Sequence, residues 1–116
     1  MMLFTSCEKK EVIPNTTVLT DIAPTDWQYS TSTKTYYVTI NMPEITQNVN
    51  RYYGIMASIS SGNNLFEALP EVYNGYSYTY THNIGILTLE VQRSDGATVL
   101  PPAYPITAKI VLIPSN

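Results

Sequence analysis

The 116-residue chain is weakly acidic and poor in charge, with a net charge of −3, 13% charged residues and 44% hydrophobic residues. This length is typical of one domain, and the acidic balance without a basic patch argues against nucleic-acid binding. A single cysteine excludes an internal disulfide and a multi-cysteine metal site, and no apolar run reaches the roughly 18 residues that a membrane-spanning helix needs.

The only cysteine, Cys7, lies between a short apolar stretch and the charged cluster Glu8–Glu11. One interpretation is a small buried residue, because free cysteines are often buried. Four consecutive charges are a poor flank for a core residue, however, and Leu3–Cys7 resembles the end of a bacterial lipoprotein signal peptide. That resemblance implies cleavage before Cys7, acylation of its thiol and new amino group, and stable membrane anchoring by two or three acyl chains.

The segment before Cys7 is short for such a signal. A working signal peptide has a basic region and an apolar core of about 7–15 residues, whereas only Met1–Phe4 precede the small residues here. We therefore expect the natural start to lie upstream of Met1. The predicted organisation is a signal-peptide remnant over residues 1–6, a tether over 7–15 and a single domain over 16–116.

Most of the remaining chain alternates polar and apolar residues, which is typical of half-buried strands. The clearest alternation covers Tyr36–Met42, Tyr52–Ser60, Tyr76–Thr81, Ile84–Arg93 and Tyr104–Ile113, and weaker strands are expected at Thr17–Ile22, Trp27–Ser30 and Leu65–Leu69. No long segment keeps the spacing of an amphipathic helix. One helix of one or two turns is expected over Pro43–Asn50, because proline suits the first helical position.

Turn-forming residues separate these strands. Asn74-Gly75 is the strongest hairpin signal, and Ser61–Asn64 and Ser94–Gly96 also favour turns. His82-Asn83 is predicted to turn the chain between two strands. Seven or eight short strands at this spacing predict an all-β antiparallel sandwich of immunoglobulin-like type, although the antibody pattern of two cysteines around a tryptophan is absent.

Residues suited to catalysis are sparse. His82 is the only histidine, so it cannot build an ordinary zinc site, and no nucleophile-elbow pattern accompanies it. Glu67 could pair with Glu71, and Asp21 with Asp26, but a small sandwich offers little room for the cleft of a glycosidase. The aspartates are too scattered for a calcium loop. We therefore expect no catalytic residue, metal or cofactor, and keep a small hydrolase only as a remote alternative.

The tyrosines are the most informative set. Tyr76, Tyr78 and Tyr80 share one face of a predicted strand, and Tyr73 precedes the hairpin turn. One interpretation is that this face packs into the core or against neighbouring strands. The other is an exposed aromatic platform that, together with Trp27, stacks on sugars or on a partner protein.

Several segments together carry a family resemblance: Phe4–Lys10, Asp26-Trp27, Tyr37–Thr46, Ala68–Pro70 and Ile106–Pro114. On these segments the chain resembles small cell-surface lipoproteins of Bacteroidota-type bacteria. The resemblance implies an all-β domain tethered to the outer membrane through Cys7, and it carries no active residues over to this chain. The leading hypothesis is a non-catalytic binding or structural module with an unknown protein or glycan partner. The alternative is a carbohydrate-binding accessory domain that uses surface aromatics.

Overall fold

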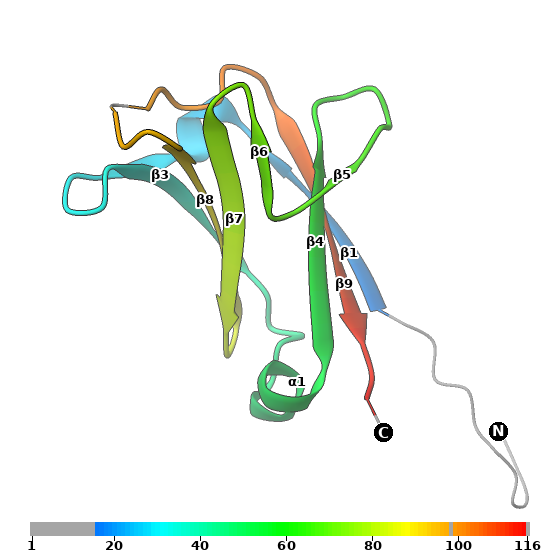
Figure 1. Cartoon of the computed structure of the whole chain (residues 1–116). Coiled ribbons are helices and arrows are strands. Elements are labelled where there is room, and N and C mark those ends of the chain that lie inside the picture. Colours follow the sequence, from blue (N-terminus) through cyan, green and yellow to red (C-terminus); the bar gives the residue numbers. More distant parts are fainter. Residues whose placement is uncertain (1–15, 98, 116) are drawn as a thin grey trace, which may run out of the picture.

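The computed structural model describes residues 16–97 and 99–115. Over this part of the chain, nine strands form two antiparallel sheets that pack face to face (Figure 1). The predicted all-β sandwich is therefore confirmed. The four-stranded sheet has the order β1-β9-β4-β5, and the five-stranded sheet has the order β2-β3-β8-β7-β6.

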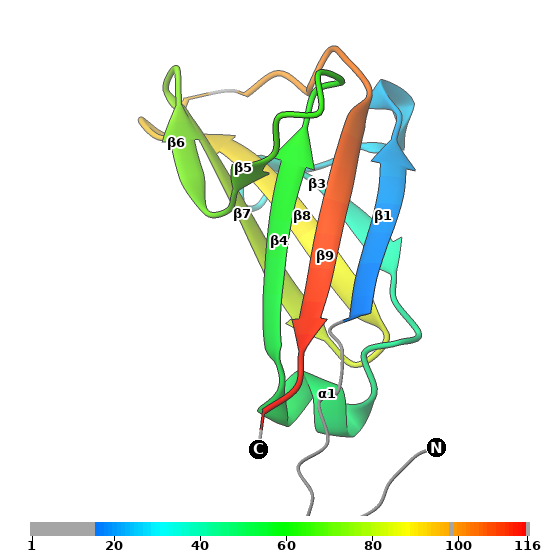
Figure 2. The same cartoon turned by 90° about the vertical axis from the view of Figure 1, so that its right-hand side faces the viewer.

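The four-stranded sheet faces the viewer in Figure 2, and it consists of β1 (Thr16–Ile22), β4 (Gly54–Ser60), β5 (Glu67–Ala68) and β9 (Ile106–Ile113). The other sheet consists of β2 (Gln28–Ser30), β3 (Thr35–Asn41), β6 (Glu71–Tyr73), β7 (Tyr76–Asn83) and β8 (Ile86–Arg93). A 3-10 turn, η1 (Pro24–Asp26), and one α-helix, α1 (Gln47–Tyr52), complete the described elements. The expected strand at Leu65–Leu69 is reduced to the two-residue β5, and the chain then enters the other sheet as β6.

The core lies between the sheets, and its residues are those that the alternation predicts. The inward faces of β3 and β8 pair in register, with Val38 opposite Leu89 and Ile40 opposite Leu87. From the other sheet, alternate residues of β9 face them, and these are buried: Ile106, Ala108, Ile110 and Leu112. Burying such a face removes apolar surface from water, which is the main driving force for folding.

Two local predictions are wrong. The helix begins at Gln47 and not at Pro43, because Thr46 caps it: its Oγ1 accepts a hydrogen bond from the Val49 N–H at 3.2 Å. His82 lies within β7, opposite Leu87, and does not turn the chain. The turn follows it and includes Gly85, whose φ of 79° suits glycine.

The strand register defines two ends of the sandwich. Thr16 pairs with Leu112, and α1 leads directly into β4, so these residues share one end, which we call the closed end. Met42 and Ile45 are buried there, and α1 lies beneath the sheets (Figures 1 and 2). Ile22 pairs with Ile106 at the opposite end, which we call the open end.

Candidate functional site

A groove of about 510 Å³ lies between the two sheets at the open end. The loop after β4 and the short strand β5 form one wall, the β6–β7 hairpin forms the other, and residues 100–104 border it from above. Four tyrosines line it, which are Tyr73, Tyr76, Tyr78 and Tyr104. A concave surface with aromatic walls and a few polar groups is typical of a ligand site.

The crossing from β5 to β6 places two carboxyl groups in this groove. Glu67 on β5 lies opposite Ile59, whose side chain packs against the core. Glu71 on β6 lies opposite Tyr78. Both glutamates line the groove from edge strands of different sheets, with Glu71 partly buried and Glu67 exposed.

The two carboxyl groups influence each other's environment. Burial, a hydrogen bond with Glu67 and the negative charge of Glu67 together raise the pKa of Glu71 to about 7. Burial also raises the pKa of the Tyr78 hydroxyl, assisted by the charge of Glu71. The residues that line the groove include no lysine, arginine or histidine. The groove is therefore acidic and has no cation among its lining residues, although the Arg93 guanidinium lies 5.6 Å from the centre of the Tyr76 ring in its wall.

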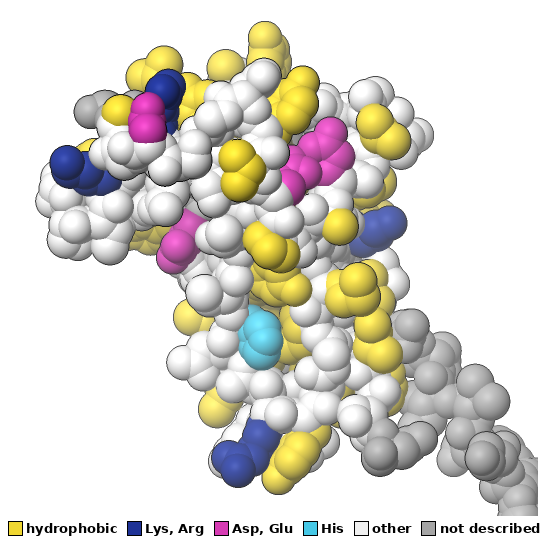
Figure 3. Space-filling view, in the orientation of Figure 1, with side chains coloured by type: hydrophobic (Ala, Val, Ile, Leu, Met, Phe, Trp, Pro, Cys, Tyr) yellow, Lys and Arg dark blue, Asp and Glu magenta, His cyan; other side chains and the backbone are white. Residues whose placement is uncertain are grey.

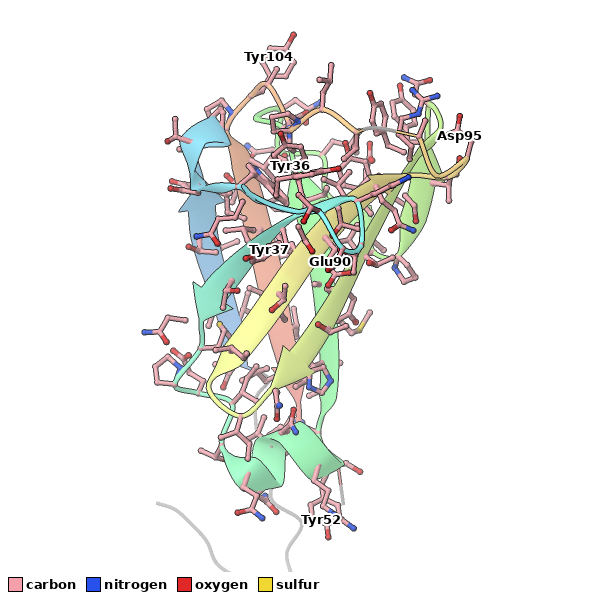
Figure 4. All side chains as sticks on the ribbon, turned by 90° about the vertical axis from the view of Figure 1, so that its left-hand side faces the viewer. Tyr36, Tyr37, Tyr52, Glu90, Asp95 and Tyr104 are labelled. Carbon is pink, nitrogen blue, oxygen red and sulfur yellow. The ribbon has the colours of Figure 1, made fainter. Side chains whose placement is uncertain are left out.

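Large apolar side chains surround the groove and remain exposed to solvent. Their exposed fractions are 62% for Leu65, 62% for Tyr73, 70% for Leu100 and 71% for Tyr104. Figure 3 shows acidic side chains beside hydrophobic ones in this upper part of the molecule, and Figure 4 shows Tyr104 at the tip. Contiguous exposed apolar surface marks an interaction site more often than scattered single residues do.

The predicted tyrosine stripe faces inward. Tyr76, Tyr78 and Tyr80 are partly buried and pack against the core. The Tyr80 hydroxyl donates a hydrogen bond to the Ile55 carbonyl oxygen of the other sheet at 2.7 Å. Tyr76 and Tyr78 line the groove, whereas Tyr80 does not. The stripe thus contributes two rings to a groove wall, and its third ring links the sheets.

The other residues singled out from the sequence lie elsewhere. Trp27 is buried in the core away from the groove, and its Nε1 has no hydrogen-bond partner within the described residues. Cys7 lies outside the described residues. His82 donates from Nδ1 to the Asn50 Oδ1 at 2.6 Å and so joins β7 to α1.

The aspartates serve local structure. Asp21 accepts a hydrogen bond from the Thr107 hydroxyl at 2.9 Å, and Asp26 accepts one from the Ala23 N–H at 2.8 Å. Asp95 pairs with Arg93 at 3.0 Å, and the hydrogen bonds from Arg93 and from the Ala97 N–H lower the pKa of Asp95 to about 2. Among the residues that the structure describes, no three histidine, cysteine, aspartate or glutamate side chains gather into a metal site.

The sequence indicates that Glu67 and Glu71 can pair, but it does not assign the pair to a site. It gives no indication that Leu65, Leu100 and Tyr104 belong to the same groove. The spacing of the two glutamates around Leu69-Pro70 gives no clear signal, because they meet only where the chain bends and passes from one sheet to the other. Leu100 and Tyr104 lie among prolines, where no periodic pattern indicates which side chain is exposed.

Comparisons with known proteins give no guide to the role of this groove. No protein-family model, curated protein or solved structure matches the chain. Within the described residues, no helix has the length and apolar character needed to cross a membrane.

Proposed function

We propose that the protein is a lipid-anchored surface lipoprotein of the outer membrane, whose sandwich is a non-catalytic binding module with its ligand site in the groove. The observation that carries this proposal is the position of the groove. It lies at the open end, whereas Thr16, where the described chain begins, lies at the closed end. A tether that precedes Thr16 joins the sandwich at the end that faces the membrane, so the groove points outward.

The groove supports binding better than catalysis. Its only carboxyl groups, Glu67 and Glu71, lie close enough for Glu67 to raise the pKa of Glu71. A glycosidase separates its two carboxyl groups by roughly 5 Å or more to accommodate the sugar or a water molecule. The lining residues include no histidine or cysteine, so the common Ser–His and Cys–His pairs are absent from the groove lining. Aromatic walls with exposed rims are instead the usual anchors of recognition surfaces.

The anchoring is tested by mass spectrometry of the amino terminus, on protein made from its native locus with the upstream region intact. We expect a diacylated or triacylated Cys7. A Cys7→Ser variant should lose the acyl groups and leave the membrane fraction, while its sandwich stays folded. An unmodified thiol at Cys7 in the native protein would contradict the anchoring half of the proposal.

A carbohydrate-binding accessory domain is the second candidate. It is favoured by the four tyrosine rings in the groove and by two carboxyl groups that can accept hydrogen bonds from sugar hydroxyls. A glycan array probed with the full chain and with a Tyr104→Ala variant tests it. Binding that the variant loses would support a glycan ligand, and an array without signal above background would reject it.

A further inference from the structure

We propose that the groove takes a basic side chain, lysine or arginine, presented between apolar residues by a partner protein. This inference rests on the proposed binding function and names the chemistry of its ligand. It follows from three features of the groove: its uncompensated charge, its rings and its aliphatic rim.

The charge of the groove lacks a cation. Both charged side chains in its lining are glutamates. Two basic residues lie on neighbouring strands, but neither pairs with Glu67 or Glu71 in the described part of the chain. Lys109 Nζ lies 4.5 Å from the centre of the Phe66 ring. Arg93 is paired with Asp95 at 3.0 Å, and its guanidinium lies 5.6 Å from the centre of the Tyr76 ring at the groove wall. A cationic ligand therefore supplies the charge that the chain itself does not, which is the basis of electrostatic complementarity.

The rings around the carboxyl groups suit the same ligand. Tyr78 lies directly across from Glu71, and Tyr76 lies across from Tyr73 on the same side of the hairpin. The face of a tyrosine ring is negative and attracts an ammonium or guanidinium group within about 6 Å of its centre. The carboxyl groups and the Tyr78 ring thus line one groove, and both favour a cation, whereas the Tyr76 ring already has the Arg93 guanidinium beside it.

The rim favours a protein over a glycan. Leu65 and Leu100 are aliphatic, and they border the groove with most of their surface exposed. Aliphatic side chains offer no stacking face and no hydrogen bond to a sugar, but they pack well against apolar residues of a peptide. The segment that fits carries its basic side chain into the groove and places apolar neighbours on this rim.

Protonation gives the interaction a characteristic pH dependence. The titratable groups that share the groove with Glu71 are Glu67 from β5, Tyr76 and Tyr78 from β7, Tyr73 from β6 and Tyr104. Arg93 from β8 lies over the Tyr76 ring. Glu71 is the group whose charge changes near neutrality, since its pKa is about 7. A basic side chain stays charged in this range. Affinity for the basic segment should therefore rise between about pH 6 and about pH 8, as Glu71 loses its proton.

A random peptide library displayed on phage tests the inference. The full chain is the target, and a Glu67→Gln/Glu71→Gln double variant is the counter-target, because glutamine keeps the shape and removes both charges. Individual peptides are then titrated by calorimetry at about pH 6 and about pH 8, beside matched peptides in which the basic residue is replaced by glutamine. Circular dichroism checks that the double variant is folded.

We expect enriched peptides to carry one basic residue at a fixed position with apolar neighbours. The double variant and the glutamine peptides should each bind at least about tenfold more weakly, and the rise with pH should vanish in the double variant. Enrichment of peptides without a basic residue would overturn the inference and leave the binding function standing. No enrichment would overturn it too, and a positive glycan array would then assign the groove to sugars.

Discussion

The two ends of the sandwich are formed by the same strands but are finished in different ways. At the closed end, Met42 and Ile45 are buried, and α1 covers the edge of the core. At the open end, Leu65, Leu100 and Tyr104 are exposed around a groove. The chain therefore has the means to cover its core at one end and leaves apolar surface uncovered at the other. Within the described part of the chain, apolar side chains such as Tyr52 and Ile84 are exposed at the closed end too, but only at the open end do exposed apolar residues gather around a groove.

The largest expected effect compares one truncation at each end. Met42→Ala removes a fully buried side chain at the closed end and should lower the free energy of unfolding by about 3 kcal/mol. Leu100→Ala removes a side chain that is 70% exposed and should change it by less than about 0.5 kcal/mol. Urea denaturation measures both. If both variants lose the same free energy of unfolding, the two ends are packed alike and the contrast between them is wrong.

The β6–β7 turn tests whether the hairpin that forms one wall of the groove depends on its backbone conformation. Asn74 and Gly75 both have positive φ, of 52° and 78°, as a tight hairpin with a primed turn requires. Gly75→Ala meets no neighbouring atom, so its cost is backbone strain, about 1–2 kcal/mol of unfolding free energy. Asn74→Gly keeps the turn and should be nearly neutral. If Gly75→Ala is as stable as the native chain in urea, the hairpin does not hold this wall of the groove.

The carboxyl pair should make stability fall as pH rises. The pKa of Glu71 is about 7 in the folded protein and 4.5 when unperturbed, so the folded state binds an extra proton between these values. The free energy of unfolding therefore decreases from about pH 4.5 to about pH 7, on the order of 1 kcal/mol after allowance for solvent screening. Glu71→Gln should remove this decrease, and Glu90→Gln on β8 should not. If the free energy of unfolding depends on pH in the same way in the native chain and in both variants, Glu71 does not have the raised pKa that the groove implies.

The smallest expected effect lies at the closed end. Asn50→Ala removes the partner of His82, and this partly buried hydrogen bond should contribute about 0.5–1 kcal/mol. Asn48→Ala lies on the same helix at an exposed position and serves as the control for helix propensity. Thermal unfolding compares the two variants. If Asn50→Ala and Asn48→Ala have the same melting temperature, the hydrogen bond to His82 does not stabilise the packing of α1 against β7.

The sequence predicts the sandwich well because its strands are half-buried. Alternation alone identified the inward residues of β3, β8 and β9, such as Val38, Leu89 and Ile110. It failed where a short-range preference competed: Pro43 suggested a helix start, but the Thr46 side chain supplies the cap. The groove was beyond such reasoning, because Glu67 and Glu71 meet only when the chain changes sheets between them. A period of two gives the face of a residue but not the sheet that it joins.

The most direct test of the central claim compares two exposed tyrosines at opposite ends of the molecule. Tyr104 at the open end is 71% exposed and Tyr52 at the closed end is 59% exposed, and Figure 4 shows them at opposite tips. Each is replaced in turn by photoreactive p-benzoylphenylalanine in the full-length protein, which is then irradiated in intact cells. The account predicts a discrete crosslinked partner from position 104 and none from position 52. Crosslinking to the same partner from position 52 alone, or equally from both positions, would contradict it.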